Sequence, residues 1–127
     1  KTTSKSLGLR HCGMRVYRHD SDEPSVMKKA GGKGLSDQGF TEALRTYFSG
    51  GIESGVRSRV IEQMIERVDN MTEAVRRVSG FRFYSSSVLL VYDGDPSSDL
   101  VDCRIIDFAR ATVPCVLPGV LTRLSVF

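Results

Sequence analysis

An aspartate near the end of an apolar run is the residue of this sequence best placed to do chemistry. The run is Val101–Phe108, and Asp107 is its penultimate residue. We expect a buried strand here, and a lone buried carboxylate needs a cation, a metal ion or several N–H donors beside it. In phosphoryl transfer such an aspartate can hold the Mg²⁺ that bridges nucleotide phosphates. The pattern alone favours the alternative, a salt bridge to Arg82 or Arg104 at the strand end.

Three consecutive serines form the second candidate. Ser85, Ser86 and Ser87 lie within the aromatic and β-branched run Phe81–Tyr92, where serine packs poorly and its hydroxyl needs a partner. The turn after this run predicts an antiparallel hairpin with the strand that carries Asp107. The serines can then face phosphate or metal-bound water beside that carboxylate, although three serines on an edge strand would give the same pattern.

The third candidate is a basic, glycine-rich segment from Lys28 to Ser36. Glycines expose backbone N–H groups, Lys29 and Lys33 add positive charge, and a helix is expected to follow, so the segment favours an anion. It does not match the G-x-x-x-x-G-K-[ST] phosphate loop, and a solvated basic loop is the alternative. Residues 1–35 carry eight basic and three acidic side chains, a net charge of +5.

The elements expected around these candidates begin with a hairpin. Apolar and polar residues alternate from Arg10 to Tyr17, and Ser25–Lys29 reads as the return strand. A flexible connector over Gly31–Gly34 follows. After it, Ser36 is the expected cap of a helix that ends at Gly50–Gly51. Its apolar stripe is Phe40, Ala43, Leu44, Tyr47 and Phe48.

A second helix is expected from Val56 to Val78, with Glu73 paired to Arg77. Its inward-facing residues are Val60, Ile61, Met64, Ile65, Val68, Val75 and Val78. Beyond Ala109, prolines predict an irregular tail. The whole chain is therefore expected to be an α+β domain of antiparallel hairpins packed with two helices.

Composition narrows the class of protein. A chain of 127 residues with 40% apolar content suffices for one core, and it has no apolar run long enough to cross a bilayer. The polar start and the three widely spaced cysteines, taken as buried thiols, favour the cytoplasm or nucleus. A net charge of +3, without aromatic residues interleaved among the basic ones, argues against nucleic acid. Oligomeric state is left open.

Taken together, four segments resemble the inositol polyphosphate kinase family, most closely its hexakisphosphate kinases. The segments are Leu7–Tyr17, Gly34–Ser36 with Gly39–Phe40, Phe81–Gly94 and Ile106–Ala109. The resemblance implies ATP- and Mg²⁺-dependent phosphoryl transfer to an inositol phosphate, by a two-lobed, protein-kinase-like fold of which this chain is part of the C-terminal lobe.

The resemblance also implies roles for residues of this chain. Asp107 would bind the metal ion and thereby the nucleotide. Ser86 and Ser87 would belong to a catalytic serine motif, and Lys29 and Lys33 would approach the polyanionic substrate.

Two departures from the family qualify this expectation. The family's P-x-x-x-D-x-K-x-G motif and its nucleotide-binding lobe are absent here, so residues 1–110 are expected to be a partial catalytic domain that is inactive alone. Residues 111–127 are expected to be a tail that departs from the family. Multikinase activity is an alternative, because Gly13–Tyr17 suits that branch as well, and a non-catalytic module that binds inositol phosphate or protein is another.

Overall fold

The structure, a computed structural model, divides into two compact units. It describes residues 3–18, 21–50, 55–78, 80–117 and 120–125, with the backbone alone described at residues 18, 113–117 and 120–125. Unit 1 comprises residues 1–61 and 93–100, and unit 2 comprises residues 62–92 and 101–127. Both units combine helix with antiparallel strands, so the predicted α+β class is confirmed.

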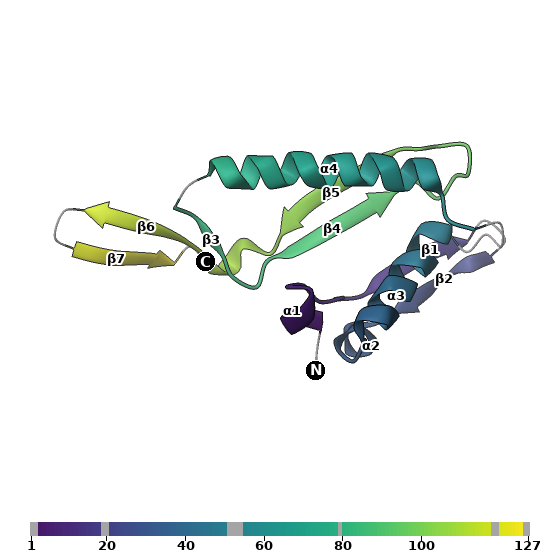
Figure 1. Cartoon of the computed structure of the whole chain (residues 1–127), viewed down its shortest axis with the longest axis horizontal. Helices are drawn as coiled ribbons and strands as arrows, with labels where there is room; N and C mark the ends of the chain where they lie inside the picture. The colour runs from purple at the N-terminus through teal and green to yellow at the C-terminus, as the bar shows by residue number, and fades with distance from the viewer. Residues whose placement is uncertain (1–2, 19–20, 51–54, 79, 118–119, 126–127) are drawn as a thin grey trace. The chain divides into compact units, whose positions relative to one another are not determined.

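In unit 1 the predicted N-terminal hairpin is present. Strands β1 (Met14–Arg18) and β2 (Ser21–Met27) pair antiparallel, and helix α3 (Asp37–Ser49) contacts β1 (Figure 1). Val16 is buried, as the alternating pattern predicts, but Cys12 precedes the strand and is exposed. The prediction of a buried thiol is therefore wrong for Cys12, because the alternation that suggested it extends beyond the strand. A short helix, α1 (Thr3–Ser6), lies at the start of the unit.

The expected glycine-rich connector is instead a short helix. Helix α2 (Lys29–Lys33) uses the N–H groups of Gly31 and Gly32, which donate to the Lys28 carbonyl oxygen at 3.0 and 3.3 Å. These groups are therefore not free to bind an anion. Gly32 is buried against His11, and a Cβ atom there would meet the His11 carbonyl oxygen and lie 2.9 Å from Nδ1. Glycine is required at this position because the two backbones approach each other closely.

Helix α3 begins and ends as predicted. The Ser36 side chain accepts a hydrogen bond from the Gly39 N–H at 3.1 Å, and Gly50 adopts the left-handed conformation that ends the helix. Ala43 and Phe48 of the predicted apolar stripe are buried. Gly51, the other half of the predicted stop, lies outside the described residues.

His11 is a buried polar side chain of unit 1. It is 9% exposed, its ring lies edge-on to Phe40 with the ring centroids 6.2 Å apart, and its Nδ1 has no hydrogen-bond partner in the described part of the chain. Burial disfavours the charged imidazolium, which lowers the pKa of His11 from 6.5. The structure thus holds His11 in its neutral form.

This burial predicts an acid-sensitive unit 1. The unfolded chain binds a proton at His11 near pH 6.5, whereas the folded chain does so only at a lower pH. Stability is therefore complete above pH 6.5 and falls as the pH drops below it. We expect the thermal unfolding midpoint to decrease between pH 7 and pH 5.5 and this decrease to shrink in His11→Gln. The control is His19→Gln, which removes the only other histidine. If the unfolding midpoint falls equally with pH in both variants, His11 is not the group responsible for the acid sensitivity.

The long helix α4 (Ser58–Arg77) provides residues 62–77 to unit 2. Met64 is buried as predicted, but Ile65 and Val78 are 56% and 43% exposed, because the helix buries a narrower stripe than its apolar periodicity suggests. Glu73 pairs with Arg76 at 2.7 Å rather than with Arg77, since residues three apart also face each other on a helix. Among the described helices, none combines the length and the apolar character needed to span a membrane.

Strands β4 (Ser87–Tyr92) and β5 (Val101–Ile106) form the predicted second hairpin, alongside α4 (Figure 1). The run expected as one strand over Phe81–Tyr92 is broken. Strand β3 (Arg82–Phe83) ends before Ser85, whose φ of 60° is left-handed, and β4 starts after it. A residue with such a φ cannot continue an extended strand.

The tail predicted to be irregular contains two strands. β6 (Ala111–Leu117) pairs antiparallel with β7 (Val120–Ser125), and β3 pairs with β6 only at Ala111 and Thr112. From Val113 onward β6 therefore has one partner strand in the described residues. A proline such as Pro114 is tolerated on an edge, where its missing N–H removes no ladder hydrogen bond. Pro118 and Gly119 lie outside the described residues, and the division at residue 110 stays a prediction.

Candidate functional site

The β4–β5 register brings Ser86, Ser87 and Asp107 to one end of the hairpin. Ser87 lies opposite Ile106 in the last pair of the ladder, so Ser86 and Asp107 are the first residues beyond the paired ends of the two strands. The Ser86 Oγ donates a hydrogen bond to the Asp107 backbone carbonyl oxygen at 3.2 Å. The expected proximity of serines and aspartate is confirmed, and the roles of these residues stay predictions.

The environment of Asp107 differs from the expected buried one. The residue is exposed, and no hydrogen bond or ion pair reaches its carboxylate from the described part of the chain. β5 ends one residue earlier, so Asp107 lies beyond the strand, although the apolar run that suggested burial continues to Phe108. The alternative of a salt bridge with Arg104 is wrong, because Arg104 Nε instead donates to Asp102 at 2.6 Å. That hydrogen bond lowers the pKa of the Asp102 carboxyl.

The backbone of Asp107 is also unusual. With φ 65° and ψ 62° the residue is left-handed, and it precedes a single turn of 3₁₀ helix, Phe108–Arg110. This conformation costs an L-residue about 1–2 kcal/mol, although aspartate and asparagine tolerate it better than most residues. Such outliers persist where surrounding contacts impose them, and they cluster at functional sites. The left-handed conformations of Asp107 and Ser85 were not predicted. The only feature of the sequence that indicated a break in the strand was the poor strand propensity of three consecutive serines.

A single exposed carboxylate fits a magnesium site of the kind found in phosphoryl-transfer enzymes. Mg²⁺ usually keeps several waters and is bound by one or two carboxylates together with substrate phosphates. Within the described residues, no group of three His, Cys, Asp or Glu side chains could hold a metal by itself. Asp107 is the residue here that would hold the ion. When bound, the ion would neutralise charge on nucleotide phosphates.

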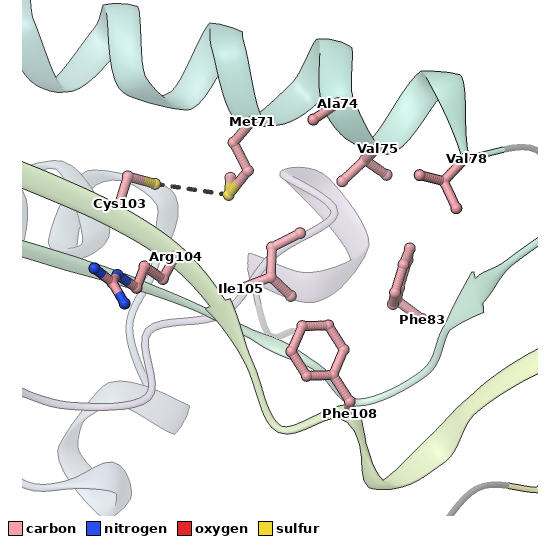
Figure 2. A pocket seen from close by; sticks show the side chains of 9 residues that line it. All are labelled: Met71, Ala74, Val75, Val78, Phe83, Cys103, Arg104, Ile105 and Phe108. Atoms are coloured by element: carbon pink, nitrogen blue, oxygen red, sulfur yellow. Dashed lines mark hydrogen bonds between the residues drawn. The ribbon is translucent and has the colours of Figure 1, made fainter.

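An apolar hollow lies beside this end of the hairpin, next to the residue that follows Asp107 (Figure 2). It measures about 410 Å³, and side chains of α4 and β5 line it together with Phe83 and Phe108. Phe108, the neighbour of Asp107, meets Phe83 edge to face with ring centroids 5.9 Å apart. In the same hollow the Cys103 Sγ lies 3.7 Å from the Met71 Sδ. Partial burial raises the pKa of the Cys103 thiol, which is half-buried rather than fully buried as expected.

Lys29 and Lys33 are both exposed on α2, four residues apart. This spacing places them on one face of the helical turn, where two ammonium groups can meet one polyanion. They belong to unit 1, whereas Ser86, Ser87 and Asp107 belong to unit 2.

Comparison with known proteins identifies the family. The family model described as inositol polyphosphate kinase matches residues 1–117. The chain belongs to the inositol polyphosphate kinase family. The predicted resemblance is thereby confirmed, and the match reaches past Ala109, where a departure was expected, into β6.

Similar members of the inositol polyphosphate kinase family include inositol hexakisphosphate kinases. The chain is 35% identical to inositol hexakisphosphate kinase 3 of Mus musculus, a match that covers 88% of this chain and 32% of that protein. It is 34% identical to inositol hexakisphosphate kinase 1 of Rattus norvegicus, over 90% of this chain and 26% of that protein. The chain thus spans about a third or less of the length of these relatives.

A solved structure supports the same fold. The crystal structure of the inositol phosphate multikinase of S. cerevisiae, in complex with ADP and Mn²⁺, matches with a TM-score of 0.64 and 25% sequence identity. The match covers 93% of this chain and 58% of that chain. The predicted fold, part of an inositol phosphate kinase, is therefore confirmed.

Proposed function

We propose that the protein containing this chain transfers the terminal phosphate of ATP to inositol hexakisphosphate, which yields a diphosphoinositol product. The observation that carries the proposal is the exposed Asp107 carboxylate beside Ser86, at a hairpin end, in a chain of this family. The choice of acceptor is supported by relatives that are named inositol hexakisphosphate kinases. The ADP and Mn²⁺ of the similar solved structure support the use of a nucleotide and a divalent ion.

In this proposal Asp107 binds Mg²⁺, and through it the phosphates of ATP. Lys29 and Lys33 contact the phosphates of the acceptor, because their shared, exposed face suits a ligand with several adjacent negative charges. Ser86 and Ser87 act beside Asp107. Positioning and charge neutralisation supply most of the catalysis in phosphoryl transfer. We therefore expect this chain, which spans a third or less of its relatives, to be inactive when isolated.

The proposal is tested by the choice of acceptor in the whole protein. With Mg²⁺ and ATP, we expect hexakisphosphate to be phosphorylated with a higher kcat/KM than trisphosphate. In the double variant Lys29→Gln, Lys33→Gln we expect the KM for hexakisphosphate to rise about tenfold, because two charge-assisted contacts are lost. Lys5→Gln, which removes an exposed lysine of α1, is the control. Absence of phosphorylation of any inositol phosphate would refute the proposal.

Multikinase activity is the second candidate, and the structural similarity to an inositol phosphate multikinase favours it. The same assay separates the two functions. A kcat/KM that is higher for trisphosphate than for hexakisphosphate would select the multikinase function and reject the first proposal.

A further inference from the structure

We infer that Ser86 is a positioning residue whose hydroxyl holds Asp107 in its left-handed conformation and so sets the direction of the metal-binding carboxylate. The inference rests on the proposed function for the role of that carboxylate. It assigns Ser86 a task different from contact with phosphate, and it rests on the backbone geometry at the end of the β4–β5 hairpin.

The ladder of backbone hydrogen bonds stops just before Asp107. Ser87 and Ile106 are its last pair, and with φ 65° and ψ 62° the backbone of Asp107 leaves the extended conformation. A left-handed non-glycine residue needs contacts that impose it. Backbone pairing in this hairpin does not extend to Asp107, and in the described residues a side-chain hydrogen bond reaches its backbone instead.

The Ser86 hydroxyl provides such a contact. Its Oγ donates to the Asp107 carbonyl oxygen at 3.2 Å, which fixes the orientation of the peptide group that joins Asp107 to Phe108. A serine hydroxyl has a single hydrogen to donate. While it is used in this bond, Ser86 cannot donate to a phosphate oxygen, and its influence on the reaction must pass through Asp107.

A second contact holds the other side of the same peptide group. The Phe108 ring meets Phe83 edge to face, with centroids 5.9 Å apart, in the apolar hollow of Figure 2. This aromatic contact restrains the Phe108 ring, which is 49% exposed, whereas the Ser86 hydroxyl contacts the carbonyl of Asp107 itself. Removing the hydroxyl should therefore free the Asp107 backbone while Phe108 stays packed, which would leave the fold intact.

The test compares Ser86→Ala with the whole wild-type protein in three measurements. We expect NMR couplings of the Asp107 amide to show loss of the positive φ, without any ligand present. We expect the affinity for Mn²⁺ in the presence of ADP, followed by electron paramagnetic resonance, to fall about tenfold, as for other groups that orient a metal ligand. We expect kcat to fall while the KM for the inositol phosphate stays the same.

Three further variants sharpen the result. Ser86→Thr keeps the hydroxyl donor and should have the Mn²⁺ affinity of the wild type. Ser86→Cys, a weak donor of similar size, should lower the Mn²⁺ affinity. It replaces Ser86→Ala in the comparison if the alanine variant does not fold. Ser97→Ala removes an exposed hydroxyl that donates to Asp95 and should change nothing. The inference is overturned if Asp107 keeps its positive φ, or Mn²⁺ affinity is unchanged, in Ser86→Ala and Ser86→Cys.

Failure of this inference is distinguishable from failure of the proposed function. The conformation of Asp107 and the binding of Mn²⁺ are both measured without an inositol phosphate. A protein that phosphorylates no inositol phosphate, but whose Asp107 conformation and Mn²⁺ affinity depend on Ser86, would refute the proposed function and support the positioning role. Normal kinase activity with an Asp107 conformation that is independent of Ser86 would support the proposed function and refute the positioning role.

Discussion

Asp107→Asn in the whole protein is expected to lower kcat by about 100- to 1,000-fold at saturating ATP, because a metal ion contributes several kcal/mol to stabilising the transition state. Asparagine has nearly the same shape as aspartate and tolerates the left-handed conformation equally well. The substitution therefore removes the charge and leaves the backbone of the hairpin end unchanged. The measurement is the initial rate of phosphoryl transfer as a function of Mg²⁺ concentration, and excess Mg²⁺ should recover part of the lost rate.

The control for this experiment is Asp69→Asn. Asp69 is an exposed aspartate of α4, and its replacement makes the same chemical change away from the hairpin end. We expect its rate to equal that of the wild type. Normal Mg²⁺-dependent activity in Asp107→Asn would contradict the metal-binding role and remove the structural support for the proposed kinase function.

Gly32→Ala is expected to destabilise the protein by about 2–3 kcal/mol, through steric overlap with a backbone that cannot move aside. The new Cβ would meet the His11 carbonyl oxygen and lie 2.9 Å from its Nδ1. In a helix, alanine is otherwise more stable than glycine by about 1 kcal/mol. A destabilised variant would therefore show that the contact between α2 and the segment around His11 dominates over helix propensity.

Gly34→Ala is the matched control for this substitution. Gly34 ends the same short helix with φ −93° and ψ −1°, and no atom lies within 4 Å of a Cβ built there. Its replacement should change the free energy of unfolding by less than about 0.5 kcal/mol. The measurement is the unfolding midpoint in urea at pH 7.5, where His11 is neutral. Equal midpoints in the two variants would show that the close approach of Gly32 to His11 does not stabilise the protein.

The local sequence pattern was sufficient to predict the elements that depend on residues close to one another in the chain. The cap at Ser36, the left-handed stop at Gly50 and the β4–β5 hairpin are all present as predicted. Hydrogen bonds between residues a few positions apart, or across one turn, determine these features, so residue types at fixed spacing suffice to predict them. The proximity of Ser86 to Asp107 follows from the hairpin in the same way.

Burial was decided by the tertiary structure. Asp107 was expected to be buried and is exposed, and Ile65 has the apolar spacing of a core residue but is 56% exposed. Periodicity shows which side chains share a face, and only packing against other segments decides how much of that face is covered.

The Glu73–Arg76 pair differs from the expected one because two partners were within reach along the helix.

The sequence by itself determined helices α3 and α4, the β1–β2 and β4–β5 hairpins, the pairing that brings serines to Asp107, and the family resemblance that the comparisons confirm. Only the tertiary structure decided that the glycine-rich segment is helix α2 packed on His11, that β6 pairs with β7, and that Asp107 is left-handed under a hydrogen bond from Ser86. The physical reason is the distance along the chain over which each effect acts. Propensity and periodicity act over a few residues, whereas close backbone approach, strand partnership and backbone strain depend on segments that meet in space.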